Sequence, residues 1–445
     1  MAMVLVAVAL ILSSTVTAPA VSHRFAPRQR YIGASAPLSG PLRHPNCSCV
    51  PASLCRPLDT PHPSREIFGA YIHDRTIPHL NYSGLTTLFI GPPATLDPAV
   101  ICAAHAHGVR VVSSVGFPGA LLGPPGPFNP AYAATPAARA SWVRHVLYGN
   151  GSASSPGVAT VGLDGVLVDI EKYKGNRSTL TALIAELAVE LKAWHPSSQL
   201  SFALSVMPGS QSSYYDHLAL SRLIDYVFVM AYDEWPFEAW PNGTTVAAAN
   251  SDLRTLQTAL ASYKTIGVPP GKLVMGLPWY GYDFPCDDNA TGPPPPEGAP
   301  CLSSGAGKTP IKERAVLDQL KSMAPHPPTM FRGNASASLY FDFQCTNQSK
   351  ECPSGRANTG GALLGRHQIW WDDASTLRQK YEYCRTLGVL GVGVYSLDFV
   401  SYETSQGAAN WAALTDVWPR PAQPPTVLKT DDGAGCSCST ARLRV

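Results

Sequence analysis

The chain alternates between two hydrophobic patterns. Eight runs are almost continuously apolar, which is typical of parallel strands covered on both faces. They span residues 67–72, 85–91, 109–116, 163–171, 200–208, 226–234, 272–282 and 389–398. Between several of them, apolar residues recur every three or four positions, as in helices that bury one face. Eight strands alternating with helices predict an α/β fold, a (β/α)8 TIM barrel, with an open doubly wound sheet as the alternative.

Local signals place the ends of several helices. Asp97 is expected to cap a helix that has Pro98 at its first position and Gly108 just beyond its end. Ser251 is expected to cap a second helix, and Gly388 to follow a third. The helix after Ser251 has an apolar stripe of Leu253, Leu256, Leu260 and Tyr263. The helix before Gly388 has a stripe of Leu377, Tyr381, Cys384 and Leu387. A further helix, after the fourth run, has a stripe of Leu180, Leu183, Ile184, Leu187 and Leu191.

Three segments fall outside this alternation. Residues 283–369, between the seventh and eighth runs, are rich in Gly, Pro and Cys and are predicted to form an insert. Residues 21–60 and 419–445 are rich in Pro and lack a hydrophobic pattern, so we expect them to be extended or disordered. The predicted barrel domain therefore spans residues 61–418.

Composition excludes several classes of protein. The chain has 445 residues, of which 45% are hydrophobic and only 14% charged, a globular composition with a large core. The 33 Lys and Arg against 31 Asp and Glu leave a net charge of +2. This near-balance gives no electrostatic reason to expect a nucleic acid or an anionic membrane as the partner.

Residues 1–20 are predicted to be a signal peptide. An apolar run over residues 4–12 precedes small residues that suit cleavage after Ala18 or Ala20. Because no basic segment comes before the run, an N-terminal anchor is the alternative. Sequons of the form N-x-S/T, which support passage through the secretory pathway, occur at Asn46, Asn81, Asn150, Asn176, Asn242, Asn289, Asn334 and Asn347. We expect the mature protein in a lysosome or vacuole or outside the cell, with no attachment to a membrane.

The cysteines favour disulfide bonds over metal binding. No pair shows a zinc spacing with supporting His, so an oxidising compartment explains them better. Cys102 and Cys384 lie on apolar helical patterns and are expected to be core thiols. The other cysteines cluster at Cys47, Cys49 and Cys55, at Cys286, Cys301, Cys345 and Cys352, and at Cys436 and Cys438. The total is 11, so at least one thiol is left unpaired.

The fourth apolar run ends in two carboxylates. Side chains alternate along a strand, so Asp169 and Glu171 share a face with Gly165 and Leu167. If that face lines the barrel, both acids project at its carboxyl-terminal mouth, where such barrels hold their active sites. Close spacing and apolar surroundings are expected to raise a carboxyl pKa, as general-acid cleavage of a glycosidic bond requires. An ion pair that merely caps the strand is the alternative.

The motifs then resemble family 18 of the glycoside hydrolases, the chitinases and their relatives. Its D-x-x-D-x-D-x-E signature is matched by Asp164, Asp169 and Glu171, while Leu167 stands where the family has Asp or Asn. Its M-x-Y-D motif on the sixth strand is matched by Met230, Tyr232 and Asp233. Segments resembling the chitobiase branch of the family are CRPL, REIFGAYI, FNPAYAATPAARASWV and WYGYDFPC.

This resemblance implies a mechanism assisted by the substrate's own acetamido group. Glu171 would protonate the glycosidic oxygen, and the acetamide oxygen would attack the anomeric carbon, giving an oxazolinium ion. Asp169 would orient the acetamide, Tyr232 would hydrogen-bond its oxygen, and Asp233 would help to hold the sugar. Water activated by Glu171 would then complete hydrolysis with retention. No metal and no cofactor is implied.

Other residues are expected to bind substrate. Met230 belongs to the family motif at the mouth. Tyr395 stands where the family has a Trp beneath the sugar, and a Tyr offers a smaller stacking area. Trp279 is expected to line a sugar subsite, with a core position as the alternative. The loss of the lower carboxylate at Leu167 is expected to slow reorientation of Asp169.

The resemblance implies hydrolysis of β-1,4-linked N-acetylglucosamine, in chitooligosaccharides or in the chitobiose core of N-glycans. The partner is therefore an N-acetylglucosamine-containing oligosaccharide. A chitinase-like lectin is one alternative, although such relatives usually lack the terminal Glu of the signature. An endo-acting chitinase is the other, although no Cys-rich or aromatic chitin-binding module is recognisable.

Overall fold

The computed structural model describes most of one compact unit, which spans Pro41–Val445. The described residues are 52–72, 80–92, 94–152, 155–211, 214–234, 245–287, 295–303, 309–323, 325–345 and 365–421. The predicted signal peptide and the segment from residue 422 onward lie outside them. Within this part of the chain, no helix combines the length and the apolar character needed to cross a membrane.

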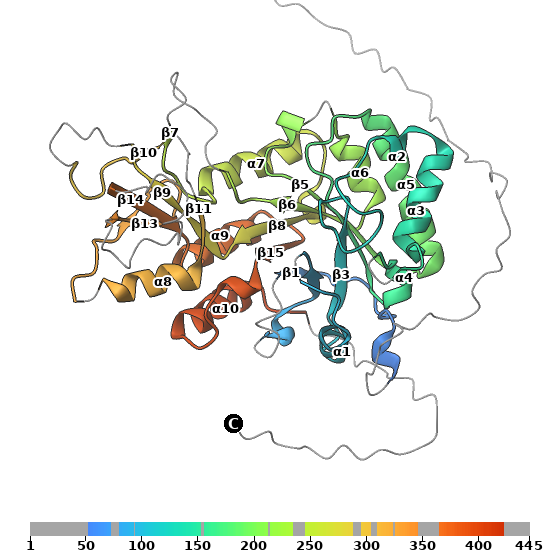
Figure 1. Ribbon diagram of the computed structural model, residues 1–445, viewed down its shortest axis with the longest axis horizontal. Coiled ribbons are helices and arrows are strands. Elements are labelled where there is room, and N and C mark those ends of the chain that lie inside the picture. The colour runs from blue at the N-terminus through green and yellow to red at the C-terminus, as the bar shows by residue number, and fades with distance from the viewer. Residues whose placement is uncertain are drawn as a thin grey trace, which may run out of the picture. The chain divides into compact units, whose positions relative to one another are not determined.

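Eight parallel strands close into a barrel, which confirms the predicted (β/α)8 fold (Figure 1). The strands are β1 (Glu66–Tyr71), β2 (Thr87–Ile90), β3 (Arg110–Val115), β4 (Gly165–Val168), β5 (Gln199–Ser205), β6 (Tyr226–Met230), β8 (Leu273–Pro278) and β15 (Gly391–Tyr395). They follow the order β1-β15-β8-β6-β5-β4-β3-β2, and β1 pairs with β2 to complete the ring. Each strand falls within, or one residue outside, one of the eight apolar runs. β4 needs glycine at Gly165, because a Cβ there would lie 1.9 Å from the Gln199 carbonyl oxygen.

The helices begin and end close to the expected signals. They are α1 (Pro98–Ala106), α2 (Ala131–Ala134), α3 (Pro136–Tyr148), α4 (Val158–Val161), α5 (Arg177–Trp194), α6 (His217–Leu223), α7 (Leu253–Thr265), α8 (Glu313–Ser322), α9 (Ala374–Thr386) and α10 (Ser405–Val417). Asp97 caps α1 by accepting from the Ala99 amide at 2.8 Å. Asp252, not Ser251, caps α7, because its carboxylate accepts from the Arg254 amide. Ser251 Oγ is buried and has no hydrogen-bond partner among the described residues.

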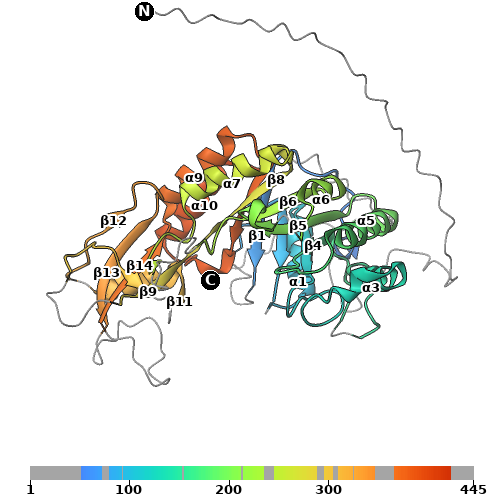
Figure 2. The ribbon, with the colours of Figure 1, turned by 90° about the horizontal axis from the view of Figure 1, so that it is seen from above.

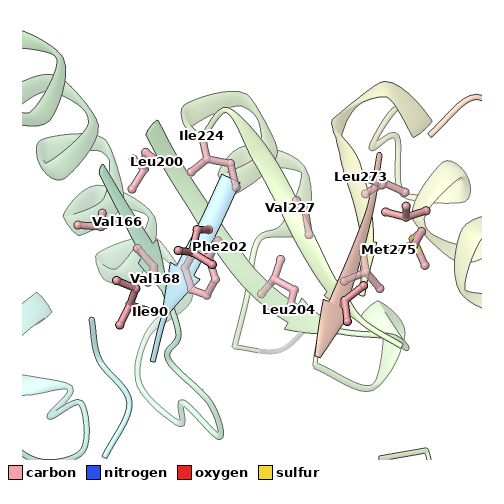
Figure 3. Close-up of a cluster of buried hydrophobic side chains, with 14 of the residues drawn as sticks. Ile90, Val166, Val168, Leu200, Phe202, Leu204, Ile224, Val227, Leu273 and Met275 are labelled. Atoms are coloured by element: carbon pink, nitrogen blue, oxygen red, sulfur yellow. The ribbon is translucent and has the colours of Figure 1, made fainter. Parts of the chain in front are cut away.

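The core has two separate layers. Outward-facing strand residues, including Val166, Val168 and Phe202, pack with the surrounding helices (Figure 3). Inward-facing residues, including Phe68, Leu167 and Phe228, fill the interior of the barrel. Leu167 therefore faces inward between two outward-facing neighbours, as the predicted alternation along this strand requires.

The insert forms its own antiparallel sheet to one side of the barrel strands (Figures 1 and 2). Its strand order is β11 (Thr309–Lys312), β9 (Tyr280–Pro285), β14 (Gly365–Trp371), β13 (Leu339–Cys345) and β12 (Phe331–Arg332). A two-stranded sheet joins β7 (Thr245–Val246) to β10 (Leu302–Ser303). The seventh barrel strand ends at Pro278, so residues 280–282, which we expected to continue it, belong to the insert sheet.

Part of the Pro-rich N-terminal segment is ordered, contrary to expectation. Residues Ala52–Cys55 form a 3-10 helix, and the Leu58 amide donates to Asp164 at 2.6 Å. Thr60 and Pro61 offer their carbonyl oxygens to the Arg110 guanidinium. Buried polar contacts, which the composition does not reveal, thus hold residues 52–61 against the barrel.

One cysteine assignment is wrong. Cys102 takes part in a disulfide, as do Cys55 and Cys345, although we expected Cys102 to be a core thiol. A helical apolar pattern does not distinguish a buried thiol from a buried disulfide. Cys286 and Cys301 are joined across the start of the insert. Cys384 is a buried free thiol, as expected.

Candidate active site

The candidate site begins at the turn that follows β4. The strand ends at Val168, three residues earlier than predicted, although the Asp169 amide still donates to the Val115 carbonyl of β3 at 2.9 Å. Asp169 is half-buried, Glu171 is exposed, and Lys172 has a left-handed φ of 53°. The turn therefore holds one carboxyl in the barrel mouth and presents the next one to solvent.

Asp169 lies in surroundings that disfavour its charge. Burial, followed by the negative charge of Glu171, raises the pKa of Asp169 to about 7. Its Oδ1 is buried and has no hydrogen-bond partner among the described residues. Leu167 precedes it on the same face of the strand and is almost fully buried within the apolar barrel interior. An apolar side chain thus occupies the position where the family signature has a second carboxylate.

Glu171 is also shifted toward its neutral form. Burial of its inner part raises its pKa, Lys172 acts in the opposite direction, and Asp233 raises it further. The expectation of raised carboxyl pKa values is therefore met for both members of the pair. An exposed carboxyl whose pKa is raised is better suited to donate a proton to a leaving group.

Two stacked tyrosines lie beside the pair. Tyr232 follows β6 and Tyr395 ends β15, and their rings stack at 5.1 Å between centroids with an interplanar angle of 23°. Burial first, and then nearby charges that include Asp169 and Glu171, raises the pKa of Tyr395 to about 12. Burial first, and then nearby groups that include the same two carboxylates, also raises the pKa of Tyr232. Together with the half-buried Met230, these rings pack against the apolar barrel interior.

Asp233 is fixed by contacts from two elements. It has a left-handed φ of 58°, and its amide donates to Asn250 Oδ1 at 2.8 Å. Its Oδ1 accepts from the hydroxyls of Tyr280 and Tyr282, each at 2.5 Å. Both tyrosines belong to β9, so the insert sheet orients a carboxylate next to the acid pair. No sequence signal connects Tyr282 or Asn250 with Asp233, since their contacts depend on the path of the insert.

Trp279 does not line the site. Its side chain is fully buried, and its Nε1 donates to the Tyr381 hydroxyl at 3.1 Å. The edge-to-face contact with Trp411 has a centroid distance of 5.4 Å. The expected sugar subsite is therefore wrong for this residue, and the alternative, a core position, is correct.

Asp164, the first acid of the signature, lies before β4 and plays a structural part. It accepts from the amides of Leu58 and Val111 at 2.6 Å and from His105 Nε2 at 2.8 Å. Burial alone would raise the pKa of Asp164, but His105 and the two amides lower it. The carboxylate joins β3, β4, α1 and the N-terminal segment, at the opposite end of the strand from Glu171. Among the described residues, no three His, Cys, Asp or Glu side chains gather in a way that would hold a metal ion.

Comparisons with known proteins agree with this geometry. The family model for glycosyl hydrolases family 18 matches residues 102–399. The chain is 28% identical over 396 residues to di-N-acetylchitobiase of Mus musculus, covering 85% of this chain and 95% of that protein. It is 27% identical over 369 residues to di-N-acetylchitobiase of Homo sapiens, covering 80% of this chain and 84% of that protein. These matches confirm the resemblance that the motifs indicated.

Solved structures show the same fold. A class V chitinase from Nicotiana tobaccum aligns with a TM-score of 0.57 and 18% identity, covering 80% of this chain and 99% of that one. A family GH18 chitinase from Cycas revoluta in complex with (GlcNAc)3 aligns with a TM-score of 0.56 and 17% identity, covering 79% and 99%. At these identities the likeness shows the barrel fold alone.

Proposed function

Because the chain is a glycosidase that belongs to family 18 of the glycosyl hydrolases, we propose that it hydrolyses β-1,4-linked N-acetylglucosamine. The substrates are chitooligosaccharides or the chitobiose core of N-glycans. The relatives named di-N-acetylchitobiase, to which the chain is similar over most of its length, support this substrate class.

The observation that carries the proposal is the unequal placement of two neighbouring carboxyls. Glu171 is exposed and can reach a glycosidic oxygen, whereas Asp169 is set deeper with a buried, unpartnered Oδ1. A buried acceptor of this kind suits the N–H of a 2-acetamido group, which would replace the missing partner. The pair thus favours substrate-assisted, retaining hydrolysis over attack by an enzyme carboxylate.

The residues then act in sequence. Glu171 donates its proton to the departing sugar oxygen while the acetamide oxygen attacks the anomeric carbon. Asp169 accepts from the acetamide N–H and stabilises the positive charge that develops on the ring formed. Water, deprotonated by the Glu171 carboxylate, attacks the anomeric carbon from the face that the leaving group vacated, so the configuration is retained.

The surrounding residues bind the sugar. The Tyr232 hydroxyl donates to the acetamide oxygen, and the Tyr395 ring forms the floor beneath the sugar face. The Tyr280 and Tyr282 hydroxyls occupy Asp233 Oδ1, so Oδ2 is the oxygen that accepts from a sugar hydroxyl. Met230 supports the floor from within the barrel.

The first test compares Glu171→Gln with Glu190→Gln, an exposed position on α5. We expect Glu171→Gln to lose nearly all turnover of chitotriose and to keep its binding, because the amide retains shape but donates no acid proton. Glu190→Gln serves as the matched control and should behave like the wild type. Turnover by Glu171→Gln close to that of the wild type would contradict the role of the acid. Wild-type binding without cleavage would place the protein among the lectins.

A second test concerns which bond is cut. We expect chitotriose labelled at its reducing end to release labelled monosaccharide first, as an enzyme acting from the reducing end would produce. Labelled disaccharide as the first labelled product would contradict this and indicate cutting from the other end of the substrate or a more open, chitinase-like cleft. The proposed location is the secretory pathway, ending in a lysosome or vacuole or outside the cell.

A further inference from the structure

A buried tyrosine outside the sequence motifs holds the turn that carries the acid. Tyr215 lies between β5 and α6, and its hydroxyl donates to the Ile170 carbonyl at 2.7 Å. The same oxygen accepts from the Tyr173 amide at 3.0 Å. Ile170 and Tyr173 are the residues on either side of the Glu171–Lys172 pair. One phenol oxygen therefore bridges the two ends of the turn on which Glu171 sits.

The ring of Tyr215 is itself fixed. It is almost fully buried and makes an edge-to-face contact with Phe202 of β5, at 6.2 Å between centroids and an interplanar angle of 87°. It also contacts Tyr173 at 6.1 Å and His217 at 6.0 Å. A side chain anchored on a barrel strand thus delivers its hydroxyl to the turn.

The turn requires this support because of its own conformation. Lys172 has a φ of 53°, a backbone region that non-glycine residues seldom adopt, and the neighbouring structure must therefore hold it. β4 ends at Val168, so regular strand pairing no longer fixes Ile170 or Glu171. The Tyr215 hydroxyl supplies two hydrogen bonds to this backbone, one at each end of the turn.

We propose that Tyr215 is a positioning residue for the acid, setting the place of Glu171 through the two backbone bonds of its hydroxyl. This inference rests on the proposed function, in which Glu171 protonates the leaving group. Tyr215 touches no substrate atom and acts only through the turn. Proton donation depends steeply on geometry, and a shift of about 1 Å costs on the order of 100-fold in rate.

The test is Tyr215→Phe, which keeps the ring contacts and removes one oxygen. Two matched controls are available. Tyr214→Phe changes the exposed neighbouring tyrosine, and Tyr263→Phe removes another buried hydroxyl, which donates to the Ser205 carbonyl at 2.7 Å. All three variants keep the glutamate and the aspartate of the acid pair unchanged.

Two substrates distinguish a misplaced Glu171 from a loss of folded protein. Chitobiose linked to 4-nitrophenol has a leaving group that needs little protonation, whereas chitotriose releases a sugar that needs full protonation. We expect Tyr215→Phe to lower kcat for chitotriose on the order of 10–100-fold, with KM little changed and a much smaller loss for the nitrophenyl substrate. The ratio of the two rates does not depend on the folded fraction, so a variant that is merely less stable leaves it unchanged. An unchanged ratio for Tyr215→Phe would overturn the inference.

A measurement without turnover addresses the same contact. Amide hydrogen exchange of the peptide that contains Tyr173 should be faster in Tyr215→Phe than in Tyr214→Phe, because the Tyr173 N–H loses its acceptor. Equal exchange in the two variants would also overturn the inference. Wild-type cleavage, measured in parallel, reports on the proposed function separately, so failure of one is distinguishable from failure of the other.

Discussion

At the scale of single residues, the barrel mouth brings two carboxyls together in surroundings that resist a second negative charge. Glu171 can act as an acid only while the pair keeps a proton, and the pair titrates as a unit. Burial and the neighbouring charge raise the pKa of Asp169 to about 7, so we expect the pair to lose its last proton near that pH. Activity that depends on this proton must therefore decrease on the alkaline side.

We accordingly expect kcat/KM for chitotriose to fall above an apparent pKa of about 7. In Asp169→Asn, the alkaline loss of the residual activity should begin at a lower pH, because the charge of Asp169 no longer opposes ionisation of Glu171, although that of Asp233 remains. Initial rates from pH 4 to 9 measure both values. If the rate of Asp169→Asn falls at the same alkaline pH as that of the wild type, or at a higher pH, this would contradict the coupling of the two carboxyls.

Residue-level prediction succeeded where spacing alone determined the environment. The two-residue alternation was sufficient to expect Asp169 above Leu167 and to expect raised carboxyl pKa values. It failed for Trp279, because an aromatic residue at a strand end can point into the mouth or into the helix layer. It gave no indication of Tyr215, which is separated from Glu171 by more than 40 residues and follows a tyrosine that is exposed.

At the scale of elements, the acid at the start of β4 has a purely structural part. Asp164 and His105 form a buried pair that joins β4 to α1 and also receives two backbone amides. Removal of one partner from a buried ion pair leaves the other charge uncompensated. We therefore expect this carboxylate to stabilise the end of the barrel opposite the mouth.

We therefore expect Asp164→Asn to lower the free energy of unfolding by about 3–5 kcal/mol, with kcat and KM close to the wild type wherever the variant is folded. Denaturant unfolding and initial rates below the midpoint provide the two readouts. A variant with wild-type stability but impaired turnover would show that Asp164 acts in catalysis instead.

The eight barrel strands were predictable because parallel strands buried on both faces leave continuous apolar runs. The ends of these strands were less predictable from the sequence. The run at 272–282 crosses from the barrel into the insert without any change of hydrophobic pattern, and Pro278 is followed directly by residues of the second sheet. The cap of α7 was misplaced by one residue, since Ser251 and Asp252 are both common capping residues.

At the scale of the whole molecule, the insert is coupled to the site. Its strand β9 supplies the two hydroxyls that hold Asp233, and the Cys286–Cys301 disulfide closes the segment that follows. The composition identified residues 283–369 as an insert but could not reveal these contacts, which depend on tertiary structure. The Pro-rich segment before the barrel was misjudged for the same reason.

The proposed passage through the secretory pathway also concerns the whole molecule. Among the sequons that the structure describes, those at Asn150, Asn176 and Asn334 are exposed. We expect protein produced in a eukaryotic secretory system to begin near residue 19 or 21 and to lose mass on treatment with an N-glycanase. Mass spectrometry and N-terminal sequencing measure both. An unglycosylated chain that retains Met1 would contradict this expectation.

In the proposed mechanism, the acetamido group of the substrate attacks the anomeric carbon while Glu171 supplies the proton. The most direct measurement is proton NMR of the first product formed from chitotriose, with the fully N-deacetylated trimer as the matched substrate. We expect the new reducing end to appear first as the β-anomer and the deacetylated trimer to remain uncleaved. An initial α-anomer, or comparable cleavage of the two trimers, would contradict the account.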